Sequence, residues 1–195
     1  VAQRDLPHYR YGLALALTRA GRPEESTQVL GQLVGEQPDV IAFGLGLAYW
    51  YAPERLLQGA YDLAAWRAGL AKRSVDAGGH RWSYYEGGSG EPLLLLHGLG
   101  GSKENWLLLA RHLTREHRVL IPDLPGWGES SRMPNEDYGL RAQARRVRAF
   151  VGALGLPNTH VVGHSMGGAI AGTYAAHYGG RVATLTLLAP GGVPF

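Results

Sequence analysis

The segment Gly163-His164-Ser165-Met166-Gly167 constrains this chain more than any other, because it matches the pattern G-x-S-x-G. The residues before it, Thr159–Val162, are few and largely β-branched, as in a buried parallel strand. The residues after it, Ala169–Tyr178, are rich in alanine and contain no proline, which favours a helix. The order strand, tight turn, helix predicts a nucleophile elbow, a sharp turn that holds the Ser165 hydroxyl above the edge of a sheet.

Glycine is expected at both ends of such a turn. A side chain at Gly163 or Gly167 would collide with nearby backbone, so these two residues are predicted to support the elbow. The alternative interpretation is a glycine-rich strand–helix turn with a serine that merely faces solvent. A second motif upstream favours the elbow.

The second motif begins with a run of four leucines, Leu93–Leu96, which predicts a strand buried on both faces. His97-Gly98 ends that strand, and a glycine-rich loop follows. A carbonyl attacked by Ser165 would become an oxyanion, which needs N–H donors already in place. We predict that the backbone N–H groups of Leu99 and Met166 form this oxyanion hole. His97 is predicted to shape the loop by bonding to backbone, with Gly98, rather than to act as a base.

The remaining pattern alternates strands and helices. We expect an antiparallel hairpin at the sheet edge, formed by Leu70–Val75 and Arg81–Tyr85. Ser102 is predicted to cap a helix over Lys103–Leu113. Strands are expected at Arg118–Pro122 and at Arg181–Leu188. Between them we expect an amphipathic helix, whose apolar face carries Leu140, Val147, Val151 and Leu154. The arginines at 141, 145, 146 and 148 are predicted to be the solvated face of that helix, not a nucleic-acid site.

From about Pro53 to Phe195 the chain resembles the N-terminal part of an α/β-hydrolase. The resemblance rests on Tyr85–Gly98, on Pro122–Ser130 and on Gly163–Gly168. Within that superfamily the chain is most similar to bacterial lipases and esterases of the lipase 3 type, and it also resembles C–C bond hydrolases and cofactor-free haloperoxidases. The resemblance implies an α/β fold with a mostly parallel sheet, over 53–195, that lacks its cap and last strands.

The resemblance also implies a serine hydrolase that cleaves carboxylic esters through an acyl-enzyme on Ser165. In this fold an acid and then a histidine follow the nucleophile along the chain. Residues 166–195 contain no Asp or Glu, and their one histidine, His177, should lie roughly 18 Å from Ser165 along a helix. We therefore expect this chain alone to have little or no hydrolase activity. The alternative function is a non-catalytic helical interaction module that carries an inert hydrolase fragment.

Residues 1–52 form a different segment. Leu13, Ala14, Leu17, Gly21, Leu30, Leu33 and Pro38 fall at the offsets of a tetratricopeptide repeat, so the segment resembles one such all-α hairpin. An ordinary helical hairpin is the alternative. Either could bind a protein partner. The apolar run Ile41–Tyr51 has eleven residues, whereas a bilayer span needs about twenty, so no transmembrane helix is predicted.

The composition of the chain limits which cofactors and partners are expected. The chain has no cysteine and a net charge of +3, and its histidines show no metal-ligand spacing. We predict no cofactor, no metal and no nucleic-acid partner, and a small ester or lipid as substrate. No signal peptide is visible, and the compartment stays open between bacterial cytoplasm and cell envelope. An exposed last strand at Thr184–Leu188 predicts an oligomer through an open sheet edge.

Overall fold

A computed structural model describes residues 22, 25, 28–29 and 54–192, and the chain divides into two compact units, Val1–Tyr61 and Asp62–Phe195. The repeat-like segment predicted over 1–52 lies outside the described residues, apart from four positions, and so does the apolar run Ile41–Tyr51. Among the described residues, no helix is long and apolar enough to cross a membrane.

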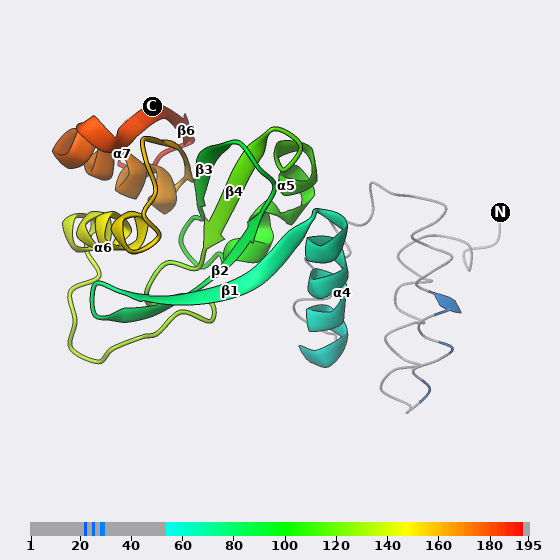
Figure 1. The fold of residues 1–195 in the computed structure, drawn as a ribbon. Helices are drawn as coiled ribbons and strands as arrows, with labels where there is room; N and C mark the ends of the chain where they lie inside the picture. The colour runs from blue at the N-terminus through cyan, green and yellow to red at the C-terminus, as the bar shows by residue number, and fades with distance from the viewer. Residues whose placement is uncertain (1–21, 23–24, 26–27, 30–53, 193–195) are drawn as a thin grey trace. The chain divides into compact units, whose positions relative to one another are not determined.

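The second unit is built on a six-stranded sheet (Figure 1). Its strands follow the spatial order β1-β2-β4-β3-β5-β6. Their bounds are β1 (Leu70–Ala77), β2 (His80–Gly87), β3 (Glu91–Leu96), β4 (His117–Pro122), β5 (Thr159–His164) and β6 (Val182–Leu188). The pairs β1–β2 and β2–β4 are antiparallel, and the other pairs are parallel. The predicted α/β class with a mostly parallel sheet is therefore confirmed, and so is the hairpin at the sheet edge.

Helical segments precede the sheet or connect its strands. They are α4 (Glu54–Arg67), a 3₁₀ turn η2 (Lys103–Trp106), α5 (Leu107–Leu113), α6 (Leu140–Ala153), α7 (Met166–Tyr178) and a short 3₁₀ turn η3 (Gly179–Arg181). Figure 1 shows α6 and α7 side by side on one side of the sheet, with α5 on the other. The helix predicted over Lys103–Leu113 thus begins as a 3₁₀ turn, with Ser102 as its N-cap. The helix predicted at Ala169 begins three residues earlier, at Met166.

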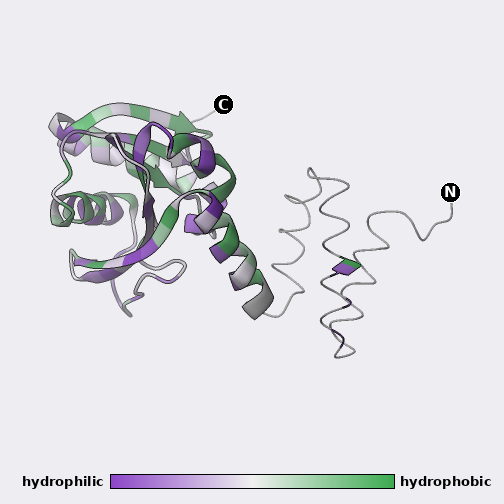
Figure 2. Cartoon of the chain, turned by 45° about the vertical axis from the view of Figure 1, so that its right-hand side comes forward, coloured by the Kyte–Doolittle hydropathy of each residue, from purple (hydrophilic) through white to green (hydrophobic). Residues whose placement is uncertain are grey.

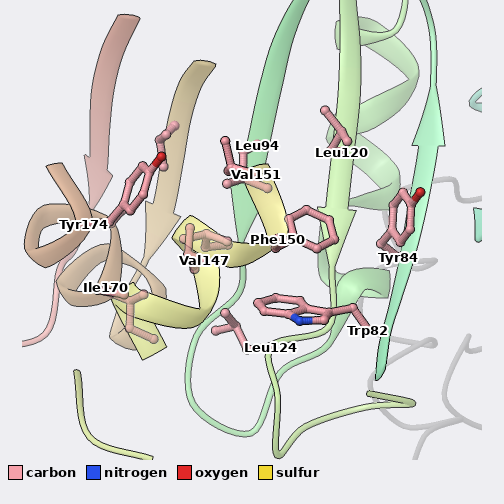
Figure 3. Packing of buried hydrophobic residues seen from close by; sticks show 14 of the residues in the cluster. Trp82, Tyr84, Leu94, Leu120, Leu124, Val147, Phe150, Val151, Ile170 and Tyr174 are labelled. Carbon is pink, nitrogen blue, oxygen red and sulfur yellow. The ribbon is translucent and has the colours of Figure 1, made fainter. Parts of the chain in front are cut away.

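The hydrophobic core lies between the sheet and the pair α6 and α7 (Figure 3). Phe150 of α6 sits at its centre, with its ring 4.7 Å from that of Trp82 and 5.3 Å from that of Tyr84, measured between centroids. Both aromatic partners come from β2, so this contact joins the hairpin to the helical layer. The leucines of β3 are buried, as the sequence predicted, because neighbouring strands flank β3 and helices cover it.

Two details of α6 were predicted wrongly. Leu140 was assigned to the buried face but is 44% exposed, because it is the first residue of the helix and lies beyond the core. Arg146 was assigned to the solvated face but is 7% exposed. It forms an ion pair with Glu136, and its guanidinium lies 4.9 Å from the centre of the Tyr138 ring. A charged side chain is tolerated there because a carboxylate and an aromatic face both contact it.

This packing gives a first prediction. Phe150→Ala should lower the free energy of unfolding by about 3–5 kcal/mol, because it opens a cavity among fully buried rings. Leu140→Ala, in the same helix but exposed, should change it by less than about 0.5 kcal/mol. Urea unfolding of both variants measures the difference. Equal losses would show that α6 does not pack as described.

Candidate active site

Ser165 lies in a one-residue turn between β5 and α7. Its backbone has φ 52° and ψ −118°, a conformation that non-glycine residues rarely adopt and that costs about 1–3 kcal/mol. The surrounding backbone holds it in place. The Ser165 N–H donates to the Leu188 carbonyl at 3.0 Å, and the Ser165 carbonyl accepts from Ala169 N–H at 3.1 Å and Gly191 N–H at 2.9 Å. Hydrogen bonds to α7 and to the end of β6 with the loop after it thus fix one strained residue.

Two glycines make this turn sterically feasible. A Cβ built on Gly163 would lie 2.3 Å from the carbonyl oxygen of Gly167. A Cβ on Gly167 would lie 2.4 Å from the carbonyl oxygens of Leu96 and His97. Real carbon atoms do not approach so closely, and the obstacles are backbone atoms that cannot turn aside. The first turn of α7 therefore contacts the ends of both β5 and β3 only because these positions lack side chains.

The loop after β3 also reaches the serine. A Cβ on Gly98 would lie 3.1 Å from both Ser165 Cβ and His164 Nδ1, so the loop backbone passes directly beside the serine side chain. Leu99 comes next, and its side chain is 73% exposed. Met166 is the first residue of α7, where backbone N–H groups have no acceptor within the helix. The structure thus brings the segments of both predicted oxyanion donors to Ser165.

His97 is buried beneath this loop, with 1% of its surface exposed. Its Nε2 accepts a hydrogen bond from Leu124 N–H at 3.0 Å, and its Nδ1 bonds to the Gly98 carbonyl at 2.8 Å. A nitrogen that accepts from an amide carries no proton, which assigns the ring as the neutral Nδ1–H tautomer. Burial lowers its pKa below the usual histidine value. Both nitrogens are occupied, so the ring cannot take a proton from Ser165 in this arrangement.

A charge cluster around the buried Lys103 and Asp123 lies behind the same loop. We call it the Lys103 cluster, and it also includes Glu104 and the partly exposed Glu129. Lys103 is 1% exposed, and its Nζ lies 2.8 Å from Asp123, 2.9 Å from Glu104 and 3.0 Å from Glu129. Asp123, fully buried, also accepts hydrogen bonds from the backbone N–H groups of Lys103 and Glu129. The cluster thus joins the segment after β3 to the loop after β4.

Protonation in this cluster follows from the contacts. Burial alone would raise the pKa of Glu129, but hydrogen bonds from Lys72 and Lys103 outweigh it and lower that pKa to about 2. Burial alone would lower the pKa of Lys103, but the Asp123 carboxylate overrides it and raises that pKa. Lys103 and Glu129 therefore stay charged near neutral pH. The sequence analysis did not single out this cluster. The only signal was a Lys at the start of a helix, followed by Asp and Glu inside the Pro122–Ser130 motif.

In the described part of the chain, no hydrogen bond joins the Ser165 hydroxyl to a histidine or a carboxylate, although the exposed His164 ring lies beside the loop at Gly98. His177 lies on α7, twelve positions after the serine, where its Nδ1 bonds to the Thr173 carbonyl at 2.9 Å. The described residues also contain no group of His, Cys, Asp or Glu side chains able to hold a metal ion. The site consists of a strained serine, a glycine loop and a helix N-terminus, which suits nucleophilic attack on a carbonyl carbon.

Comparison with known proteins agrees with this architecture. The family model described as alpha/beta hydrolase fold matches residues 91–194, which is more than half of the chain. The chain therefore belongs to the α/β-hydrolase fold family, and the resemblance noted in its sequence is confirmed at that level.

Several relatives are lipid hydrolases by name. Lipase 1 of Psychrobacter immobilis is 48% identical over 115 residues, which cover 57% of this chain and 36% of that protein. A putative lipase from Acinetobacter baumannii has a solved structure with 41% identity and a TM-score of 0.68, over 70% of this chain and 47% of that one. The solved structure of a membrane phospholipase A, described as a bacterial virulence factor, shows 37% identity and a TM-score of 0.71. The match covers 86% of this chain and 53% of that one. The chain thus spans about a third to a half of the length of these relatives.

The close backbone contact at Gly167 gives a second prediction. Gly167→Ala should lower the free energy of unfolding by at least about 1–3 kcal/mol, because the new methyl group overlaps two carbonyl oxygens. Gly172→Ala is the matched control in the same helix, where a Cβ meets nothing within 4 Å. It should raise stability by roughly 0.5–1 kcal/mol through helix propensity. Denaturant titrations compare the pair. A neutral Gly167→Ala would contradict the close approach of α7 to β3.

The buried neutral state of His97 gives a third prediction. Its pKa in the folded state lies below the unfolded value, so acidification protonates the unfolded chain first. Stability should therefore fall as pH drops below about 6.5, by up to about 1.4 kcal/mol for each unit of pKa depression. His97→Gln keeps an acceptor for Leu124 N–H and does not titrate, so its unfolding free energy should fall less between pH 7.5 and 5.5. Parallel curves for the two proteins would refute the assignment.

Proposed function

We propose that this chain carries the nucleophile of a serine hydrolase that cleaves carboxylic esters, of the esterase or lipase type. Ser165 is the nucleophile, and the N–H groups of Leu99 and Met166 are the oxyanion donors. The observation that carries the proposal is the strained conformation of Ser165, held directly beside Gly98 and at the N-terminus of α7. Strain of this kind persists where surrounding structure fixes it, and it clusters at active sites.

The proposed reaction has two halves. The Ser165 oxygen attacks the ester carbonyl carbon while a general base takes the hydroxyl proton. The carbonyl oxygen becomes an oxyanion bonded by the two backbone donors. The C–O bond to the alcohol then breaks, the alcohol leaves with the proton, and an acyl group stays on Ser165. Water attacks this acyl-enzyme in the same way, which releases the carboxylic acid and restores the serine hydroxyl.

Among the described residues, no histidine or carboxylate is hydrogen-bonded to the Ser165 hydroxyl. No Asp or Glu occurs in 166–195, His177 is remote along α7, and both nitrogens of His97 are occupied. We propose that these 195 residues alone turn over esters slowly, and that the catalytic acid and histidine come from groups outside them. Loss of both groups typically lowers kcat by about 10⁴–10⁶-fold.

The substrate we propose is a small ester or a lipid ester. The names of the relatives support this class, because they include lipases and a phospholipase. Ester cleavage at Ser165 requires no cofactor, since the protein supplies the nucleophile and the oxyanion donors.

Labelling with an alkyl fluorophosphonate tests the proposal. The chain should be phosphonylated slowly at Ser165, and added imidazole should accelerate that labelling because it supplies a base. Intact-mass and peptide-mapping measurements follow the site. Ser165→Ala should abolish the adduct, while Ser89→Ala, at an exposed serine away from the turn, should leave it unchanged.

Two results would count against the proposal. An adduct spread evenly over several serines, or none even with imidazole, would favour a non-catalytic role for the fold. Rapid turnover of p-nitrophenyl butyrate without imidazole, lost in Ser165→Ala, would show instead that a base exists within these residues.

A further inference from the structure

The loop after β3 is held at both of its ends by two consecutive residues, Asp123 and Leu124. These two residues follow β4, the parallel neighbour of β3, so both segments leave the sheet at the same edge (Figure 1). At the start of the loop, His97 Nε2 accepts a hydrogen bond from Leu124 N–H. At its end, the N–H and the Nζ of Lys103 donate to the Asp123 carboxylate, at 2.7 and 2.8 Å. We call the residues between these anchors the 98–102 loop.

The backbone of the 98–102 loop forms a tight turn. Gly101 N–H donates to the Gly98 carbonyl at 3.1 Å, and Gly100 has φ 69°, the left-handed conformation that a type II turn requires at its third residue. Leu99 is the second residue of this turn, and the turn does not use its N–H. Among the residues that the structure describes, none accepts a hydrogen bond from that N–H. Its direction therefore depends on where the two ends of the loop are fixed.

Asp123, which fixes one of these ends, is hydrogen-bonded through its backbone and its side chain. Its N–H donates to the Ser83 carbonyl at 2.9 Å, and its own carbonyl accepts from the Ser130 hydroxyl at 2.7 Å. Its carboxylate accepts from Glu129 N–H at 2.9 Å, in addition to the two donors of Lys103. The position of this fully buried residue is thus set both by β2 and by the loop after β4.

Two further features hold the surroundings of Asp123 in place. Gly128, at φ 53°, lets the loop after β4 close over the carboxylate, because a Cβ there would lie 2.2 Å from the carboxyl carbon. On the other side, Lys72 of β1 donates to Glu129 at 2.5 Å, and Glu129 accepts from Lys103 at 3.0 Å. Figure 2 shows hydrophilic residues along much of β1. The edge hairpin thus supplies charge to the Lys103 cluster from outside.

We propose that Asp123 is a positioning residue of the hydrolase: its carboxylate holds Lys103, and through Lys103 it holds the 98–102 loop with the Leu99 N–H directed at the oxyanion. The inference rests on the proposed function, in which Leu99 and Met166 are the two oxyanion donors. Asp123 acts through Lys103 and contacts no substrate. Loss of this anchor should disable the Leu99 donor and leave the Met166 donor, which begins α7, in place.

The kinetics of labelling by the alkyl fluorophosphonate, with imidazole present, test this role in Asp123→Asn. Asparagine keeps the size of the side chain but removes its charge and one acceptor oxygen. Labelling of Ser165 should slow by about tenfold or more, up to the roughly 10³-fold cost of losing one oxyanion donor entirely. The maximal rate constant should fall, while the fluorophosphonate concentration that gives half-maximal rate stays unchanged, because the donor acts in the transition state.

Lys72→Met is the matched control. It removes an ion pair on the exposed side of the Lys103 cluster but leaves both donors of Lys103 on Asp123. Its labelling rate should equal that of the unmodified chain.

Amide NMR of the phosphonylated chain gives a readout that a loss of stability alone would not produce. In the unmodified chain the Leu99 and Met166 amide protons should both move downfield on labelling, because each bonds to the phosphonyl oxygen. In Asp123→Asn only the Met166 resonance should move. If that variant does not fold, because Lys103 is left short of a partner, Lys103→Met/Asp123→Asn removes both buried charges and should give the same two results.

The outcomes separate this inference from the proposed function. Unchanged labelling and an unchanged Leu99 shift in a folded variant would overturn the role of Asp123 and leave Ser165 as the nucleophile. Equal slowing in Lys72→Met, or loss of both amide shifts in Asp123→Asn, would overturn it too, because the effect would then not be specific to the Leu99 donor. An unmodified chain that does not label even with imidazole would overturn the proposed function, and the role of Asp123 with it.

Discussion

The structure depends on one steric constraint: two backbone segments approach each other at Gly163 and Gly167 more closely than any side chain allows. Because neither residue has a Cβ, α7 can begin against the ends of β5 and β3. The chain must then turn from strand to helix within one residue. Ser165 occupies that residue, at φ 52°, and its position beside Gly98 follows from the same approach.

Two buried polar arrangements hold the surrounding loops in place. His97 links the Gly98 carbonyl to the Leu124 amide, and the Lys103 cluster links η2 to the loop after β4. Burying charges is costly unless opposite charges and hydrogen bonds surround them, as they do around Lys103. Such fully partnered groups restrict a loop to one conformation. Preorganised donors stabilise a developing oxyanion better than mobile ones, so this rigidity suits the proposed chemistry.

Local patterns predicted the fold well and buried charges poorly. The leucine run of β3 and the G-x-S-x-G turn carry their structure within a few adjacent residues, so the sequence located both. The burial of Lys103 and Arg146 is not encoded in adjacent residues. Their burial depends on carboxylates 20 and 10 positions away along the chain, Asp123 and Glu136, and no periodicity reports such a pairing. The prediction that Leu140 is buried was wrong for a different reason. Helical spacing identifies which face of a helix is apolar, but not where along the helix the core ends. The donor roles of Leu99 and Met166 stay predictions.

The central claim is that Ser165 is presented to two backbone donors, and a crystal structure of its phosphonate adduct tests it most directly. The account predicts the phosphonyl oxygen about 2.7–3.1 Å from both Leu99 N and Met166 N, with Ser165 still at positive φ. An adduct whose oxygen points into solvent, or away from either amide, would contradict it.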